Sequence, residues 1–298
     1  MNCLFCNSNK IKSENIPPNR FNDKLFYYER CMNCGLLFIN PIPNQHDLLK
    51  MYPPTYQGKI ETELIDVKKK MTGLRFSYKE QLDLINYYVT EDRKVIDFGC
   101  GTGHFIFNAK NNGLLMDGVE FSSEVVHILK NQMPENNFYT INDFYTNKLK
   151  YHVIRLSNVL EHFTSPQEEF NKLLLKLEND GIVLLEGPLE KNRSLVNFIK
   201  WNYLKLRFLL NKHYATKHAP THIFFSNYKN QLTFFEKMGL QTLHYKVIEN
   251  TWPYPETFGE VRSIGSFLKY IIGIKSKFLG IFIPNYGNTF LYVGRKGK

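Results

Sequence analysis

The sequence has no uninterrupted apolar run of about 18 residues or more, and it therefore predicts no membrane-spanning helix. The stretch from Met1 to Lys10 lacks the basic start and the apolar segment of a secretory signal, so we expect a cytoplasmic protein. Internal repeats and low-complexity tracts are also missing, which argues against a repeat architecture.

Acidic residues are missing from two segments, and these segments carry the positive charge of the chain. Lys191 to Lys217 contains seven Lys or Arg and no acid, and Arg262 to Lys298 contains seven more and again no acid. Because the net charge is +10, the other residues sum to −4. The basic character therefore belongs to the later part of the chain.

What remains is a chain with ample material for a hydrophobic core. Its 298 residues suffice for one large α/β domain or for a core domain with a small appendage. A hydrophobic content of 43%, with 15% aromatic residues, indicates a packed protein and argues against disorder.

A glycine-rich turn follows an apolar strand. The segment Val95 to Phe98 contains an acid, Asp97, and leads into glycines at alternate positions, which are Gly99, Gly101 and Gly103. Glycine suits such a turn because it accepts positive φ and lets a ligand approach the backbone. A second apolar run, 114–119, is followed by Glu120, where a carboxylate can accept hydrogen bonds from two ribose hydroxyls.

The spacing of the glycines distinguishes between nucleotides. A dinucleotide fingerprint reads Gly-x-Gly-x-x-Gly, whereas His104 stands here in the place of the third glycine. Together with Asp97 and Glu120, the pattern resembles motif I and the acidic loop of class I S-adenosylmethionine (SAM) methyltransferases. A structural turn in another Rossmann-like protein is the alternative. The resemblance implies an α/β, Rossmann-like, doubly wound seven-stranded sheet with SAM as cofactor.

The same resemblance implies roles for individual residues. Asp97 would orient the methionyl amino group of SAM, and the three glycines would contact that moiety and the ribose. Glu120 would bind the ribose hydroxyls, and Phe121 would pack against adenine. Asp143, after the third core strand, would accept a hydrogen bond from the adenine amino group. A helix N-cap or turn acid is the alternative for Asp143.

A second motif follows the fourth core strand. The residues from Leu156 to His162, followed by Ser165-Pro166, resemble the post-strand motif of a large bacterial methyltransferase family. By that resemblance Asn158 would line the methionine end of the cofactor site and His162 would face the substrate, a structural histidine being the alternative. His222 is a second candidate, because similar proteins carry a His-x-x-x-Phe-Ser segment there. We predict that His162 or His222 removes a proton from the acceptor.

Four of the five cysteines form two Cys-x-x-Cys pairs: Cys3, Cys6, Cys31 and Cys34. The spacing, with 24 residues between the pairs, predicts a four-cysteine zinc site. Two disulfides are the alternative, which a cytoplasmic setting disfavours. Four thiolates leave no open coordination position, so the zinc would be structural. The fifth cysteine, Cys100, is read as a small packing residue.

These motifs divide the chain into five parts. We expect a zinc ribbon at 1–45, a connector and lead-in helix at 46–90, a SAM-binding core at 91–190, a basic aromatic insertion covering the substrate at 191–226, and the end of the core sheet with an amphipathic helix at 227–298. Predicted strands lie near 94–98, 115–120, 137–141, 152–157, 181–186, 240–248 and 289–294. Predicted helices lie near 64–89, 103–112, 122–132, 166–178, 194–211, 227–238 and 264–283, with a loop over the site at 212–226.

Three classes of function fit this reading. A ribbon ending in Cys-Gly-Leu-x-Phe-x-Asn-Pro resembles methyltransferases of bacterial glycan and sugar biosynthesis, which implies an acidic small-molecule or glycan acceptor such as a nucleotide sugar or a lipid-linked saccharide. An RNA methyltransferase is the second class. It lacks support because no Asn/Asp-Pro-Pro-aromatic signature follows the fourth strand and the ribbon has few basic residues, so nucleic acid is not expected. A SAM-binding protein without catalysis is the third.

Membrane contact is a separate question. In 264–283, apolar residues alternate with Lys269, Lys275 and Lys277. Such a helix can lie in the surface of an anionic membrane, which would make the protein peripheral to the inner membrane face. It can equally pack on the sheet with its lysines in water, and this second reading is the one we favour from the sequence.

Overall fold

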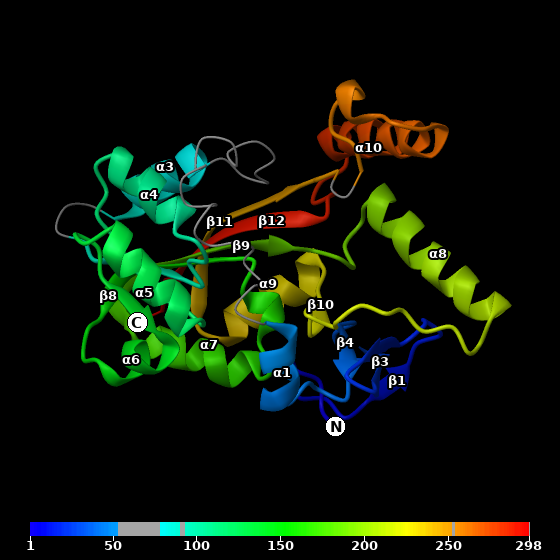
Figure 1. Ribbon diagram of the computed structural model, residues 1–298, viewed down its shortest axis with the longest axis horizontal. Helices are drawn as coiled ribbons and strands as arrows, with labels where there is room; N and C mark the ends of the chain where they lie inside the picture. The colour runs from blue at the N-terminus through cyan, green and yellow to red at the C-terminus, as the bar shows by residue number, and fades with distance from the viewer. Residues whose placement is uncertain (53–77, 90–92, 252–253, 298) are drawn as a thin grey trace.

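The computed structural model describes residues 1–52, 78–89, 93–251 and 254–297, and Figure 1 shows their arrangement. A seven-stranded sheet with helices on both faces forms the larger part, and a smaller sheet near the N-terminus lies against it. The predicted doubly wound α/β fold is confirmed. Of the predicted lead-in helix, only the end is described, as α3 (Tyr78–Tyr88); residues 64–77 lie outside the described residues.

The strand order of the large sheet reverses beside its first strand. The order is β11-β12-β9-β8-β5-β6-β7, and all strands are parallel except β12. The strands are β5 (Val95–Phe98), β6 (Asp117–Glu120), β7 (Phe138–Thr140), β8 (Tyr151–Ser157), β9 (Leu177–Pro188), β11 (Leu240–Ile248) and β12 (Thr289–Lys296). The chain runs outward from β5 to β7 and returns to β8 on the other side of β5. Ligands bind in such sheets at the carboxyl ends of the strands beside the reversal.

Helices cover both faces because the central strands are apolar on both sides. In β5, Val95 packs into the cluster that includes α3, α4 and α5, whereas Ile96 packs into the cluster that includes α6, α7 and α9. These helices are α4 (His104–Asn111), α5 (Ser123–Gln132), α6 (Ile141–Thr146), α7 (Pro166–Leu175) and α9 (Tyr228–Lys237). The sequence did not predict α6, a short helix that begins directly after β7.

The N-terminal sheet is a set of short antiparallel strands followed by a helix. Its strands are β1 (Ile11–Ser13), β2 (Asn19–Phe21), β3 (Lys24–Cys31) and β4 (Leu37–Asn40), and α1 (Gln45–Met51) follows. Asn22 and Asp23, with φ of 50° and 58°, form the two-residue turn between β2 and β3. Asp47 caps the first turn of α1 and pairs with Lys24 at 2.8 Å, which ties the helix to the sheet.

A strand from the middle of the chain completes the N-terminal sheet. β10 (Phe224–Phe225) pairs antiparallel with β4, so Phe224 lies opposite Phe38. The ring of Phe5 stacks at 4.2 Å on Phe234 of α9 and meets Phe224 edge-on at 4.8 Å. The expected loop at 212–226 is therefore wrong in part, because β10 lies within it. The N-terminal sheet and the large sheet share one hydrophobic cluster.

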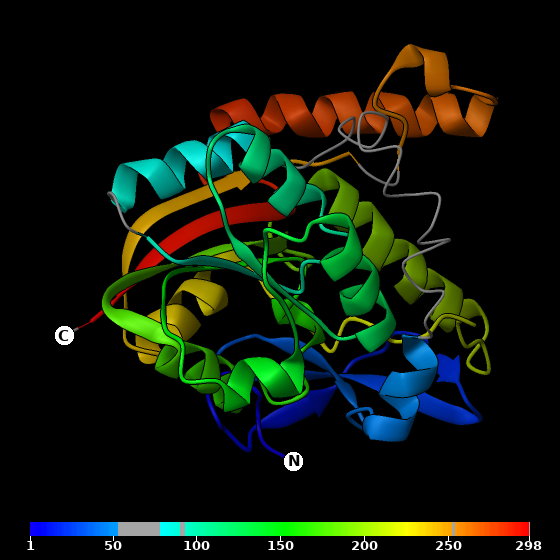
Figure 2. The same cartoon turned by 60° about the vertical axis from the view of Figure 1, so that its left-hand side comes forward.

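Two long helices lie beyond the edge of the large sheet. They are α8 (Leu195–Leu210) and α10 (Ile264–Phe282), which contact one another, and Figure 2 shows α10 far from the N-terminal sheet. α10 buries only Gly273 and Ser276, while Ile264 is 82% exposed. The favoured expectation that this helix packs on the sheet is thus wrong, whereas its lysines are exposed as expected. No described helix is long and apolar enough to cross a membrane.

A buried carboxylate joins these two helices to the sheet. Oε1 of Glu249, directly after β11, accepts hydrogen bonds from the hydroxyls of Ser194 at 2.7 Å and Ser276 at 2.9 Å. Ser194 caps α8, and Ser276 lies in α10. Burial raises the pKa of Glu249 to about 7, although the two serine hydroxyls oppose the rise. Below that pH the folded protein therefore keeps Glu249 protonated.

Replacement of Glu249 by glutamine should remove a pH dependence of stability. The folded-state pKa lies above the ordinary value of 4.5, so the folded protein holds the proton more tightly and the free energy of unfolding falls as pH rises from 4.5 to about 7. We expect the Glu249→Gln protein to be about 1–3 kcal/mol more stable relative to wild type at pH 8 than at pH 4.5. Urea unfolding at both pH values measures this difference, and an equal offset at the two values would contradict it.

Candidate functional site

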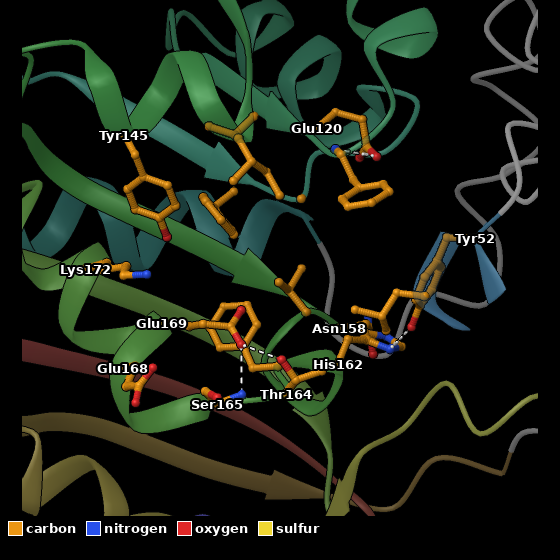
Figure 3. Close-up of a pocket in the computed structure, with 18 residues that line it drawn as sticks. Tyr52, Glu120, Tyr145, Asn158, His162, Thr164, Ser165, Glu168, Glu169 and Lys172 are labelled. Atoms are coloured by element: carbon orange, nitrogen blue, oxygen red, sulfur yellow. Dashed lines mark hydrogen bonds between the residues drawn. The ribbon is translucent and has the colours of Figure 1, made fainter. Parts of the chain in front are cut away.

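A cavity of about 610 Å³ opens at the carboxyl ends of β5, β6 and β8 (Figure 3). Its walls come from the glycine turn after β5, the end of β6, the helix α6, the segment between β8 and α7, and α1. The residues that line it include Gly99, Glu120, Phe121, Tyr145, Asn158 and His162. The cavity thus lies where the strand reversal predicts a ligand.

The glycines of the turn are required by both conformation and space. Gly99 and Gly103 have φ of 79° and 77°, and Gly101 has φ of 56°. A Cβ atom on Gly99 would lie 2.5 Å from Cγ2 of Val159, and one on Gly103 would lie 2.7 Å from Cε of Met133. Gly99 therefore keeps the cavity wall open, whereas Gly103 lets α4 begin close to the end of α5.

Glu120 ends β6 with its carboxylate fixed by backbone donors. Oε2 accepts a hydrogen bond from the N–H of Gly101 at 2.9 Å, and Oε1 accepts from Phe121 at 2.8 Å and Ser122 at 3.3 Å. Burial raises the pKa of Glu120, and these N–H groups oppose the rise. Figure 3 shows Glu120 and His162 on opposite sides of the cavity. The arrangement offers a fixed carboxylate with lone pairs left for further donors.

Aromatic and amide side chains form the rest of the wall. Phe121 is 52% exposed and lines the cavity together with Ile141 and Tyr145 of α6. Asn158 follows β8 with a φ of 54°, and its N–H donates to the carbonyl of Glu186 at 2.9 Å. The cavity is therefore apolar at one wall and polar at the other, as expected of a site for a nucleoside.

Asp143 does not line the cavity. It is exposed in the first turn of α6, where its Oδ2 accepts a hydrogen bond from the hydroxyl of Thr140 at 2.8 Å. Its N–H donates to the same hydroxyl at 3.2 Å. In this arrangement Asp143 serves the start of α6, which is the alternative that the sequence leaves open, and α6 presents Ile141 and Tyr145 to the cavity instead.

Asp97 is buried behind the glycine turn and paired with a cation that the sequence analysis did not single out. Nη1 of Arg155, in β8, lies 2.6 Å from Oδ1 of Asp97. Burial raises the pKa of Asp97, and the guanidinium of Arg155 opposes that shift. Arg155 also lies 3.7 Å above the ring of Phe105. This pair fixes the carboxyl ends of β5 and β8 relative to each other.

The Asp97–Arg155 pair continues into a buried polar network. Nε of Arg155 donates to Oε1 of Gln81 at 2.8 Å, and Nε2 of Gln81 donates to Oε2 of Glu186 at 3.0 Å. The hydroxyl of Ser157 donates to the same oxygen of Glu186 at 3.0 Å. The network joins α3 to the ends of β5, β8 and β9 and holds the polar edge of the sheet in one arrangement.

His162 stands at the cavity wall in a short helical turn, Leu160–His162, directly after β8. Its Nδ1 lies 2.7 Å from the hydroxyl of Tyr52 and 2.8 Å from the carbonyl of Thr221. Burial lowers the pKa of His162 below its ordinary 6.5, with Glu161 opposing the shift and His222 adding to it. His162 is therefore neutral near pH 7.

His222 lies beside His162 although 60 residues separate them in the sequence. The two ring centroids are 5.1 Å apart, and Nδ1 of His222 lies 2.7 Å from Oε2 of Glu190. Burial alone would lower the pKa of His222, but the carboxylate of Glu190 outweighs it and raises the pKa. Lys200 pairs with the other oxygen of Glu190 at 2.6 Å. Although burial opposes it, Lys200 and His222 hold the pKa of Glu190 well below its usual range.

The two predicted histidines and a third group converge. Glu161 brings a carboxylate to the pair, so that one donor atom of Glu161, His162 and His222 lies within 4.8 Å of the other two. Oε1 of Glu161 is buried, has no hydrogen-bond partner among the described residues, and lies 4.0 Å from Nε2 of His162. A neutral histidine, a histidine with a raised pKa and a carboxylate thus face one another beside the cavity.

The four paired cysteines also converge, from the turn before β1 and from the turn between β3 and β4. Sγ of Cys3 lies 3.5 Å from Sγ of Cys34, and Sγ of Cys6 lies 3.5 Å from Sγ of Cys31. All four sulfur atoms lie within 4.8 Å of one another, so the group can hold one metal ion. The N–H of Cys34 points to Sγ of Cys31 at 3.5 Å. Four thiols of this kind suit tetrahedral Zn²⁺.

The sequence analysis missed the groups that position the predicted residues. Tyr52, Glu190 and Arg155 each contact a predicted residue through a hydrogen bond or an ion pair. Arg155 could have been found, because a cation in an otherwise apolar strand needs a buried partner. Tyr52 and Glu190 carry no local signal, since only the fold brings them to His162 and His222.

Comparison with known proteins agrees with this geometry. Residues 68–252, more than half of the chain, match the family described as methyltransferase domain. A chain in the complex between the Haloferax volcanii Trm112 methyltransferase activator and a methyltransferase is 12% identical, with 81% of this chain and 97% of that chain covered and a TM-score of 0.55. No curated protein matches the chain.

Two further solved structures are similar at lower scores. A SAM-dependent methyltransferase from Archaeoglobus fulgidus is 17% identical, with 77% of this chain and 97% of that chain covered and a TM-score of 0.44. The 4+2 cyclase SpnF is 13% identical, with 82% and 94% covered and a TM-score of 0.48. The family match and the fold agree with the sequence motif: the chain belongs to the methyltransferase-domain family and is a SAM-dependent methyltransferase with a class I fold.

Proposed function

We propose that this enzyme transfers the methyl group of SAM to an acidic small-molecule or glycan acceptor, such as a nucleotide sugar or a lipid-linked saccharide. The observation that carries the proposal is that Glu120 and His162 line one cavity of about 610 Å³. A carboxylate suited to ribose hydroxyls and a neutral base thus face the same space, as the transfer of a methyl group to a hydroxyl or an enolisable carbon requires.

SAM supplies, when bound, a methyl group on a positively charged sulfur that is open to in-line attack. In our proposal Glu120 accepts the ribose hydroxyls, Phe121 packs on adenine, and Asn158 lines the methionine end. The backbone of the glycine turn lies against the same end. Asp97 acts on the methionyl amino group through water from behind the turn. Asp143 keeps its place at the start of α6 and takes no part in adenine binding in this proposal.

His162 is the base in this proposal. The lowered pKa keeps its ring neutral near pH 7, and the hydroxyl of Tyr52 and the carbonyl of Thr221 hold Nδ1. In this proposal Nδ1 carries the ring proton and donates it to the carbonyl of Thr221, which leaves Nε2 free to take a proton from the acceptor. Alignment of the acceptor with the methyl carbon can lower the activation barrier by about 7–11 kcal/mol.

His222 has a different role from His162. Its pKa is raised by Glu190, so it carries a proton more readily and can donate a hydrogen bond to an oxygen of the acceptor. The two histidines therefore form a pair in which one accepts a proton and the other steadies developing negative charge. This replaces the earlier expectation that either of them could be the base.

An acidic acceptor is supported by cations that gather around Lys191, the residue after the His222 partner Glu190. Nζ of Lys191 lies 3.6 Å above the ring of Trp201. Burial, together with the positive charges of Arg30 and Lys205, lowers the pKa of Lys191 to about 7. Glu14 offsets part of this repulsion, and an anionic group bound beside Lys191 would relieve more of it.

A structural Zn²⁺ at Cys3, Cys6, Cys31 and Cys34 belongs to the same proposal. The support is the convergence of four sulfur atoms within 4.8 Å of one another. Four cysteine ligands complete the tetrahedral coordination of a structural Zn²⁺, so no further ligand is needed. The metal would order the short strands of the N-terminal sheet, which is too small to build a core of its own.

The test uses purified, zinc-loaded protein with methyl-labelled SAM and a lysate separated into lipid, soluble-metabolite and RNA fractions. We expect label in the lipid or metabolite fraction. Label confined to RNA would favour the RNA alternative, for which the basic segments are the supporting observation. No label in any fraction, despite measurable SAM binding, would favour a SAM-binding protein without catalysis.

Replacement of Glu120 by glutamine should weaken SAM binding. Hydrogen bonds to a charged group contribute about 1.5–3 kcal/mol, so we expect the dissociation constant for SAM to rise about 10–100-fold. An amide also cannot accept on both atoms from the N–H groups of Gly101 and Phe121. Isothermal titration measures the change, and Glu124→Gln, at an exposed position of α5, is the matched control. Equal affinities of the two variants would contradict the role of Glu120.

A further inference from the structure

The helices α8 and α10 leave an unusual amount of apolar side chain in solvent. The exposed residues, which we call the α8–α10 surface, are Phe198, Leu206, Leu209 and Leu210 on α8 and Ile264, Phe267, Leu268, Ile274, Phe278, Ile281 and Phe282 on α10. At 3.6 residues per turn, those on α10 all fall on one side of the helix and therefore form one stripe. The buried Gly273 and Ser276 lie on the other side of the helix.

The charges that α8 and α10 themselves carry have one sign, although Lys200 and Lys205 of α8 pair with Glu190 and Glu14. Neither helix contains an acidic residue, whereas α8 carries Lys200, Lys205 and Arg207 and α10 carries Lys269, Lys275 and Lys277. Helices that combine exposed apolar residues with lysine and arginine and exclude acids bind at the surface of anionic bilayers. We propose that the α8–α10 surface docks this enzyme on a membrane that contains anionic lipid.

The charge pattern favours a bilayer over a second copy of the chain. Two copies that joined through this surface would bring twelve cations of the two helix pairs together without an acid from either helix. Anionic headgroups neutralise the cations, while the acyl chains accept the apolar side chains. The exposure of Ile264 at 82% and Leu210 at 77% also fits shallow insertion better than a flat contact between proteins.

A second cavity adjoins this surface and reaches Glu190, the partner of His222. It has a volume of about 510 Å³ and lies between the start of α8 and the end of α10. Lys191 and Arg193 line it together with Phe198 and Leu279, and so does Glu190, which holds His222. A lipid with a phosphate headgroup would find cations and apolar walls in this one place. Within the proposed function, on which this step rests, the acceptor is therefore a saccharide linked to lipid through phosphate.

Vesicle flotation of the full-length, zinc-loaded protein tests the docking surface. We expect the protein to float with vesicles of phosphatidylcholine and phosphatidylglycerol, to float weakly with phosphatidylcholine alone, and to be released by high salt. The double variant Leu268→Glu, Phe278→Glu should stay in the bottom fraction. The matched control is Leu175→Glu, Tyr87→Glu, which places the same charges on exposed apolar positions of α7 and α3 and should float like wild type.

A second variant tests the charge separately from the apolar stripe. Each Lys or Arg near an anionic surface strengthens binding about fivefold, so replacement of Lys269, Lys275 and Lys277 by glutamine should lower the partition coefficient about 100-fold. Light scattering of wild type measures the mass in solution. If wild type is a dimer and the Leu268→Glu, Phe278→Glu variant is a monomer, the surface belongs to contact with a second copy, and the proposal is overturned.

Wild type that stays in the bottom fraction with both kinds of vesicle would also overturn the proposal, as would equal flotation of the two double variants. SAM titration of every variant shows whether the fold is intact. Because flotation needs neither SAM nor an acceptor, the outcomes are separable. Flotation without methyl transfer would leave the docking surface standing and remove the proposed function.

Discussion

Replacement of His162 by glutamine lowers turnover about 10²–10⁴-fold, which is the range that a positioned acid or base contributes, and leaves the affinity for SAM unchanged. Glutamine keeps a polar side chain near Tyr52 and Thr221 but cannot take a proton from the acceptor. The measurement is single-turnover transfer of labelled methyl to the fraction that accepts it. His213→Gln, at an exposed position nine residues before His222, is the control and should retain full activity.

The pH profile separates a base from a residue that only shapes the cavity. Burial lowers the pKa of His162 below 6.5, so turnover of wild type should rise with pH through a value below 6.5. At higher pH it should fall again as His222, whose pKa is raised, loses its proton. The His162→Gln protein should lose the rising limb. If its residual activity kept the same dependence on pH, another group would be the base, and the role assigned to His162 would have to be withdrawn.

Replacement of Cys31 by serine should cause the second large effect, loss of both zinc and turnover. Cys31 is fully buried, and its Sγ lies 3.5 Å from Sγ of Cys6. Zinc binding of about 10–16 kcal/mol is coupled to folding in such modules, which exceeds what a small sheet can supply from its own core. We expect the bound zinc to fall from one equivalent to near zero and turnover to fall by about 10²-fold or more, because the sheet that holds His222 loosens.

The control for this experiment is Cys100→Ser, which changes a buried cysteine outside the four-cysteine group. It should keep one equivalent of zinc. Metal analysis gives the stoichiometry, and hydrogen exchange of β3 and β4 reports whether the sheet has loosened. Full activity of the Cys31→Ser protein, or unchanged zinc content, would show that the metal neither forms nor supports the site as proposed.

The sequence was sufficient to predict those features whose residues lie close together in the chain. The turn from Gly99 to Gly103 and the acid at Glu120 follow from backbone requirements that neighbouring residues satisfy. The strands from β5 to β9 follow from apolar runs of the right length, and their order follows from the resemblance to class I methyltransferases. These features could be predicted because each is encoded within a few residues.

The remaining features depend on contacts between distant parts of the chain. Glu190 raises the pKa of His222 across 32 residues, and Tyr52 reaches His162 across 110. The apolar residues of α10 have helical periodicity whether they face a core or solvent, so periodicity could not show that the helix is exposed. Asp143 shows the same limit, because a polar residue after a strand suits both a helix cap and a ligand contact.

The pairing of β10 with β4 limits how this protein can be recombined with its relatives. Residues 216–225 pass beside the N-terminal sheet, with Thr216 bonded to Pro18 and Arg20 and with Phe224 opposite Phe38. His222 lies within this segment. A chimera that receives residues 1–45 from another protein would therefore need the matching 216–225 segment as well. Exchange of residues 1–45 alone would therefore disrupt the pairing that positions His222. We expect residues 1–45 and 216–225 to be kept together in relatives of this protein.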